Sequence, residues 1–239
     1  MLNASAELNP LGQLLVSGSQ DADFVKLQIE SNGDLSLRDE AGDPSPIANH
    51  PDGPGSEETP LDRADVSEIR FAMDDGDDIL ELEIPRGIDV SVAPSEGNDE
   101  ADLDFSEFDP NQVAPGSSIE IQSELIRIGS STGNVSFADA AVRFDGQVQF
   151  GNPSFASQID VTRASLDWNG TFVAAGDVAF VGAGSVDLSG ATVSSVNPGV
   201  QLSVNLGSDP GSRFLFGGAN DSAGSNIDRL SVDSAGEVL

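Results

Sequence analysis

Several residue types are missing or scarce in this sequence. Its 239 residues include no cysteine and no tyrosine, one tryptophan and one histidine. The lack of cysteine excludes disulfides, cysteine-based metal sites and thiol catalysis. A glycosidase cleft needs two carboxyl groups facing a bound sugar, usually beside stacking aromatic rings, and those rings are scarce here. Nucleophilic catalysis assisted by histidine would have to rely on His50 alone.

Basic residues are equally scarce. Lysine and arginine total 10 against 41 acidic residues, which gives a formal charge of −31, and Lys26 is the only lysine. Such a charge repels nucleic acid and anionic lipid, attracts cations and favours solubility in saline surroundings. No window approaches the roughly 20 apolar residues that span a bilayer. The composition therefore predicts neither nucleic-acid binding nor membrane insertion.

The most informative stretch is 71–82, FAMDDGDDILEL, in which a short apolar strand enters an Asp/Gly turn and an alternating strand leaves it. Weaker echoes occur at 18–27 (GSQDADFVKL), 95–105 (SEGNDEADLDF) and 217–232 (GGANDSAGSNIDRLSV). Recurring units of strand, acidic turn and strand are typical of stacked β-coils.

The pattern changes after Ile119 to short apolar–polar–apolar triplets, such as 119–121, 142–144 and 186–188, with small or polar corners between them. Alternation in short strands favours a parallel β-helix, in which inward side chains stack from coil to coil. An antiparallel sandwich is the competing fold, but its strands are usually longer, about five to six residues. No stretch shows helical periodicity. We therefore predict an all-β parallel solenoid of short strands, irregular in its N-terminal part, with the buried or coil-capping Trp168 beside a corner.

Residues 40–62 interrupt this pattern with five prolines, repeated glycines and almost no apolar residues. Such a segment cannot recover its ordering entropy by burial, which predicts a disordered, mobile acidic loop with His50 solvated inside it. The polar stretch 104–115 predicts a seam between an irregular acidic region, 1–110, and a regular solenoid, 116–239. Neither end of the chain resembles a cap, so end-to-end self-association is expected.

Segment 164–196, ASLDWNGTFVAAGDVAFVGAGSVDLSGATVSSV, resembles the filamentous-haemagglutinin-type β-helix of large bacterial surface proteins. The first half is similar to degenerate haemolysin-type calcium-binding repeats in large acidic proteins of marine bacteria such as planctomycetes. The resemblance implies a right-handed β-helix, export and a structural or adhesive role. The first 20 residues contain no secretory signal, so we expect an internal piece of a larger exported chain, located extracellularly or at the cell surface.

The acidic turns are the candidate metal sites, because Ca²⁺ binds six to eight oxygen ligands. The candidate ligands are Asp74, Asp75, Asp77, Asp78, Asp99 and Asp102, with Asp21 and Asp23 in the first turn. No two nonapeptide repeats follow in tandem, so turns distant in sequence would have to stack. The alternative, which we favour, is that these carboxylates are solvated corners that keep the solenoid soluble.

No P-loop, dinucleotide fingerprint or catalytic constellation is present, so an enzyme is not expected. The predicted function is a non-enzymatic structural or adhesive segment of an exported bacterial repeat protein. Its expected partners are surface glycans, proteins or neighbouring repeat segments. The alternatives are a calcium-binding module of the haemolysin-repeat type and a carbohydrate-active β-helix.

Overall fold

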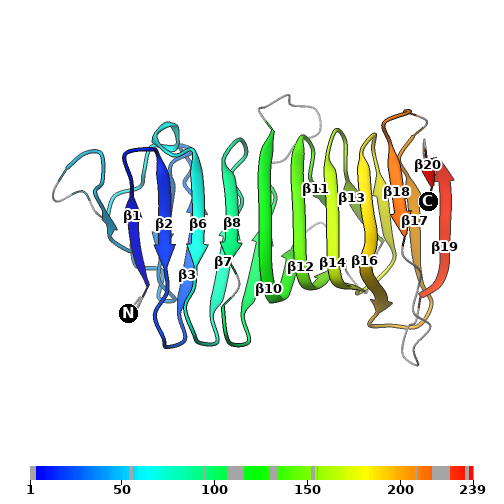
Figure 1. Cartoon of the computed structure of the whole chain (residues 1–239), viewed down its shortest axis with the longest axis horizontal. Helices are drawn as coiled ribbons and strands as arrows, with labels where there is room; N and C mark the ends of the chain where they lie inside the picture. The colour runs from blue at the N-terminus through cyan, green and yellow to red at the C-terminus, as the bar shows by residue number, and fades with distance from the viewer. Residues whose placement is uncertain are drawn as a thin grey trace.

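The computed structural model describes residues 4–53, 56, 58–93, 95–106, 116–129, 134–151, 154, 156–207, 209–216, 227–234 and 237–238. In these residues the chain is all-β, apart from a single 3₁₀ turn at Arg63–Asp65, and forms a solenoid of about six turns. Figure 1 shows the strands stacked side by side along the longest axis, from the N-terminal end to the C-terminal end. No helix in the described part of the chain is long and apolar enough to cross a membrane.

Two sheets form the walls. The 15-stranded sheet contains β1 (Ser5–Leu8), β2 (Gln13–Ser17), β3 (Phe24–Ile29), β4 (Leu35–Arg38), β5 (Ile47–Ala48), β6 (Glu68–Ala72), β7 (Ile79–Glu83), β8 (Asp89–Ala93), β9 (Glu100–Asp104), β10 (Ser117–Gly129), β12 (Ala140–Phe150), β14 (Ser165–Ala174), β16 (Ser185–Ser195), β18 (Arg213–Phe216) and β20 (Glu237–Val238). The five-stranded sheet contains β11 (Asn134–Ser136), β13 (Ser157–Asp160), β15 (Val178–Val181), β17 (Val200–Asn205) and β19 (Ile227–Ser234).

Nearly all strand pairs are parallel and in register, so inward residues of the same kind stack from coil to coil. Ile121 pairs with Phe144, and Phe144 pairs with Trp168. The ring centroids of Phe144 and Trp168 lie 5.4 Å apart, and those of Trp168 and Phe172 lie 4.6 Å apart. The predicted parallel solenoid is confirmed, as is the burial of Trp168, which is 0% exposed. The antiparallel sandwich is excluded.

The change of pattern near Ile119 corresponds to the joining of two strands into one. Strand β10 pairs with β8 through Ile119–Ile121 and with β9 through Leu125–Gly129. In the earlier coils an acidic turn separates the two strands, whereas in the later coils one long strand bends between two triplets. At the bend of β12, Gly146 has φ 143°, and a Cβ there would lie 1.8 Å from the carbonyl oxygen of Ser123. The stacking of the bends therefore requires glycine at this position.

One core runs through both predicted regions, with buried residues from Ala6 to Phe214 in the same cluster. The predicted seam at 104–115 falls largely outside the described residues. Only residues 104–106 of it are described, and Asp104 is the last residue of β9. On either side, β10 stacks on β8 and β9 and carries β12 on its other edge.

The described residues of segment 40–62 pack partly against the first coil, and the prediction of a solvated His50 is wrong, whereas the predicted mobility of the segment stays a prediction. Ile47 and Leu61 are buried, β5 pairs with β1, and Leu61 bridges Leu35 of β4. His50 is also buried, at 6% exposed, and its ring nitrogens contact the Asp52 N–H and the Thr59 hydroxyl, both at 3.3 Å. The segment was expected to be loose because its average composition is polar, yet a few apolar residues suffice to attach it to the first coil.

The N-terminal end is covered, contrary to the expectation that no cap is present. Strand β1 runs antiparallel to β2, and β4 runs antiparallel to β3. Segment 40–62 partly pairs with the outer edges of both β1 and β4, through β5, Leu61 and Pro44. Antiparallel closing strands with a covering segment protect the edge of a sheet from adding further strands.

Candidate functional site

The acidic turns stack at one corner of the solenoid and form a column of carboxylates. The N–H of Asp23 donates to Asp78 Oδ1 at 2.8 Å, and the N–H of Asp78 donates to Asp99 Oδ1 at 3.1 Å. The N–H of Asp99 donates in turn to Glu124 Oε2 at 3.1 Å. Each carboxylate thus accepts a backbone N–H from the preceding coil, at a turn where the strand ladder is interrupted.

Two members of this column carry unsatisfied oxygens. Asp78 is 0% exposed and Asp23 is 3% exposed, and Asp78 Oδ2 and Asp23 Oδ1 are buried without a hydrogen-bond partner. The pKa of Asp78 is raised to about 6, mainly by burial and also by the charges of Asp99, Asp23 and Asp77, while the hydrogen bond from the Asp23 N–H partly opposes these effects. Burial in the column therefore shifts Asp78 toward its protonated form, which predominates below about pH 6.

The six predicted calcium ligands do not converge on one point. Asp78 and Asp99 are neighbours in the column, whereas Asp74, Asp75 and Asp77 are exposed on the outside of the turn. Asp77 Oδ1 accepts hydrogen bonds from the backbone and side chain of Asn98, at 3.0 and 3.1 Å. In the described part of the chain, no group of three or more His, Cys, Asp or Glu residues is arranged to hold a metal ion. Calcium binding stays a prediction.

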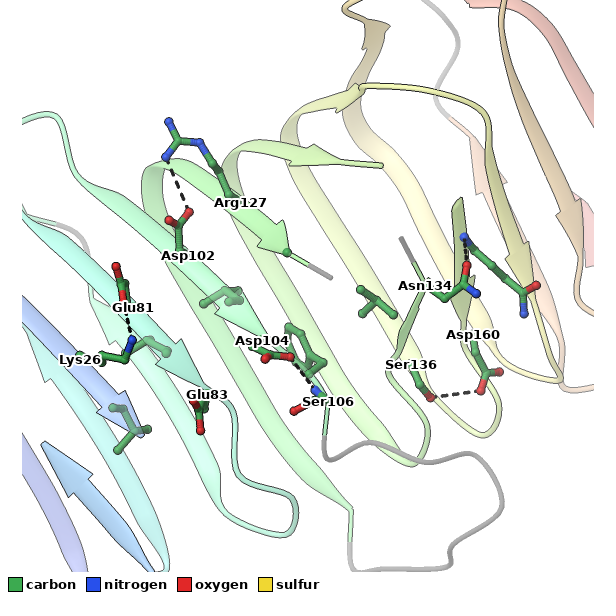
Figure 2. Close-up of a pocket in the computed structure, with 17 residues that line it drawn as sticks. Lys26, Glu81, Glu83, Asp102, Asp104, Ser106, Arg127, Asn134, Ser136 and Asp160 are labelled. Carbon is green, nitrogen blue, oxygen red and sulfur yellow. Dashed lines mark hydrogen bonds and ion pairs between the residues drawn. The ribbon is translucent and has the colours of Figure 1, made fainter. Parts of the chain in front are cut away.

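The sixth predicted ligand, Asp102, belongs to a different feature, a lateral cavity of about 920 Å³ on the flank of the solenoid (Figure 2). The cavity lies where β7, β9 and β10 approach the first strands of the five-stranded sheet. Its lining consists of Lys26, Leu27, Glu81, Leu82, Glu83, Asp102, Leu103, Asp104, Phe105, Ser106, Arg127, Gly129, Asn134, Val135, Ser136, Gln158 and Asp160. The apolar members belong to the buried core, and the polar members contribute carboxylate, amide, hydroxyl, ammonium and guanidinium groups.

The carboxylates of the cavity form two rows across the strands. Glu81 is in register with Asp102, and Glu83 is in register with Asp104. Neighbouring strands lie roughly 4.8 Å apart, and alternate residues of one strand are roughly 6.7 Å apart. Because side chains alternate between the two faces of a strand, all four carboxylates project outward together.

Two basic residues stand at the ends of the first row. Lys26 Nζ lies 2.9 Å from Glu81 Oε2, and Arg127 Nη1 lies 3.7 Å from Asp102 Oδ1 and also contacts Glu100. Burial, followed by repulsion from Glu81, raises the pKa of Asp102 above its ordinary value. Five carboxylates against two basic groups leave the lining acidic.

In the second row, Glu83 and Asp104 accept hydrogen bonds from backbone N–H groups. Glu83 Oε2 accepts the Ile29 N–H at 2.7 Å, and Asp104 Oδ1 accepts the Ser106 N–H at 2.9 Å. In the described part of the chain neither carboxylate forms an ion pair with a basic side chain. Sequence reasoning missed this row, although the alternation of ELE at 81–83 and DLD at 102–104 was a visible signal of outward carboxylates on adjacent coils.

No protein-family model, no curated protein and no solved structure matches the chain. The resemblance to haemagglutinin-type and haemolysin-type repeats therefore stays a prediction.

Proposed function

We propose that this chain is a non-enzymatic structural and adhesive segment of an exported bacterial repeat protein, located extracellularly or at the cell surface. The observation that supports this most is the stack of mostly parallel strands around one core, with the acidic cavity on its flank. In a solenoid each coil contacts only its neighbours, so such a segment extends a chain while keeping lateral surfaces at fixed positions.

The adhesive part of the proposal depends on the cavity. Its lining offers hydrogen-bond acceptors from several successive coils, and most of its side chains lie on strands. A site on rigid strands loses little conformational entropy when it binds a partner. Surface glycans and surface proteins are the partner classes that such a lining could hold.

Binding and turnover are measured together to test the proposal. The purified protein is passed over immobilised glycans, polysaccharides and extracellular proteins, and the same polysaccharides are incubated with it and analysed for chain cleavage. We expect binding to at least one surface and no cleavage. Cleavage of a polysaccharide would contradict the proposal and favour a carbohydrate-active β-helix.

A calcium-binding module is the second candidate function. The observation that favours it is the pair of buried, unpartnered oxygens, Asp78 Oδ2 and Asp23 Oδ1, in the acidic column. Titration calorimetry with CaCl₂ in low salt would show heat, and the melting temperature would rise, if a cation completed this site. Asp78→Asn would remove both effects, whereas Asp75→Asn, which changes an exposed carboxylate, would leave them.

A further inference from the structure

We propose that residues 44–53 and 58–61 form a pH-sensitive cover over the N-terminal strand edges, which stays closed while the His50 ring is neutral and is released when the ring takes up a proton. This device is independent of the proposed adhesive role, because it controls access to the first coil rather than to the lateral cavity. Three observations support it: the position of the cover, the hydrogen bonds of the ring and the burial of the ring.

The cover supplies backbone partners to the outer edges of two strands. The Ser45 N–H donates to the Leu37 carbonyl oxygen at 2.8 Å, and Leu61 exchanges two backbone hydrogen bonds with Leu35, at 2.7 and 2.9 Å. Strand β5 of the cover pairs in parallel with β1. Release would leave the edges of β1 and β4 without these partners, and an unpaired strand edge is a template for another chain.

The hydrogen bonds of His50 define a neutral ring with its proton on Nε2. The Asp52 N–H donates to Nδ1 at 3.3 Å, so Nδ1 is an acceptor. The Thr59 hydroxyl donates its single proton to the Ser56 carbonyl oxygen at 2.6 Å, so its contact with Nε2, at 3.3 Å, has the ring N–H as the donor. The neutral ring therefore links Asp52 to Thr59 across the cover and uses both of its nitrogen atoms.

A proton added at Nδ1 is incompatible with this arrangement. It would point at the Asp52 N–H, and the positive charge would arise on a side chain that is 2% exposed. Asp52 Oδ2 lies 3.8 Å from Nδ1, but the Asp52 side chain is 75% exposed and solvated. On the covered strands, Glu7 accepts a hydrogen bond from Asn49 Nδ2 at 2.7 Å, and Arg38 lies 2.8 Å from Glu30. The lost hydrogen bond and the buried charge both favour release of the cover.

The state of the ring can be read directly, because His50 is the only histidine in the chain. In protein labelled with nitrogen-15 histidine, the NMR shifts of the two ring nitrogens distinguish the two neutral forms. We expect the form with the proton on Nε2 at about pH 7.5. A neutral ring with its proton on Nδ1 would overturn the inference.

Hydrogen exchange followed by mass spectrometry tests the release. Exchange of residues 44–53 is compared at about pH 7.5 and about pH 5.5, an interval in which histidine side chains change charge and ordinary carboxyl groups stay ionised. Strand β14 in the core is the internal reference. After correction for the intrinsic chemical rate, we expect exchange of the cover to be about five- to ten-fold faster at the lower pH, as for the loss of one buried hydrogen bond, with little change in β14.

Two variants assign the effect to the ring. His50→Gln keeps a polar side chain, cannot titrate and retains Asp78, whose pKa of about 6 lies in the same interval. We expect its corrected rates at the two pH values to differ less than about two-fold, even where glutamine loosens the cover at both. Asp52→Asn keeps the N–H that bonds Nδ1 and removes the carboxylate 3.8 Å from it, so release should begin at a higher pH.

Equal pH dependence in the parent and in His50→Gln would overturn the inference. Slower exchange of the cover at about pH 5.5 than at about pH 7.5 would overturn it as well, as would release of Asp52→Asn at a lower pH than the parent. None of these results would touch the proposed adhesive role, which polysaccharide cleavage would contradict independently of the cover.

Discussion

Replacing Asp78 by asparagine should stabilise the protein at neutral pH. The carboxyl is fully buried, one of its oxygens has no partner, and burial raises its pKa from the ordinary 3.8 of an aspartic acid to about 6. The folded state therefore holds a proton that the unfolded chain releases between about pH 4 and 6. The unfolding free energy contributed by this group falls as pH rises through that window and is lowest above about pH 6.

The size of the effect follows from the shift. About two pKa units at roughly 1.4 kcal/mol per unit give a penalty of about 3 kcal/mol for ionised Asp78 above pH 6. An asparagine keeps the oxygen that accepts the Asp23 N–H. Its amide group takes the place of the unpartnered Oδ2 and can donate to the unpartnered Asp23 Oδ1. We therefore expect a gain of up to about 3 kcal/mol at neutral pH and little change near pH 4.

Denaturant unfolding at several pH values between about 4 and 8 measures this. The quantity to follow is the difference between variant and parent, because carboxylates outside the column contribute equally to both. Asp75→Asn removes the same formal charge at an exposed position of the same turn and is the control. A loss of stability at neutral pH for Asp78→Asn, or a difference that does not depend on pH, would refute the reasoning.

Three further substitutions, one of them with a matched control, probe the packing. Trp168→Ala should cost about 3–5 kcal/mol, because it empties the centre of the aromatic stack, and denaturant unfolding would show it; a cost below about 1 kcal/mol would contradict the packing described. Gly97→Ala should cost about 3 kcal/mol, since the new Cβ would lie 1.7 Å from the Gly76 carbonyl oxygen, whereas Gly33→Ala, with open space around it, should cost about 1 kcal/mol in thermal melts. Ile47→Ala should loosen segment 40–62 and speed its cleavage in limited proteolysis; an unchanged cleavage rate would show that Ile47 does not attach the segment.

The solenoid could be predicted because its signal is local. In triplets such as Ile119–Ile121, apolar residues at alternate positions determine which side chains point inward, and the short spacing limits the strand length. The long strands β10, β12, β14 and β16 could not be predicted, because a bend that continues the strand and a turn that ends it have the same polar composition. The difference depends on whether the neighbouring coil supplies hydrogen-bond partners at the bend.

The candidate site was harder to predict for a related reason. Within 71–82, Asp77 and Asp78 are adjacent and chemically identical, yet Asp77 is exposed and Asp78 is 0% exposed. Which of them points inward depends on how the turn stacks on Asp23 and Asp99, 55 and 21 residues away. The burial of His50 depends in the same way on the contacts of β5 with β1. Composition describes the average environment of a segment, whereas these positions are determined by a few distant contacts.

The corner column gives part of the acid in the first half of the chain a structural role. In the later coils the bend lies within a continuous strand, and Gly146 and Gly170 stay in register. The bend then requires only a residue without a Cβ, so that the backbones of neighbouring coils can approach closely. In the earlier coils the strands stop at the turn, and the backbone N–H groups of Asp23, Asp78 and Asp99 need acceptors that a continuous ladder would have supplied. A carboxylate on the next coil meets this need, at the cost of burying charge. The coils that contain the column should therefore depend on pH more strongly than the glycine-cornered coils, because the same carboxylates that complete their hydrogen bonds also repel one another.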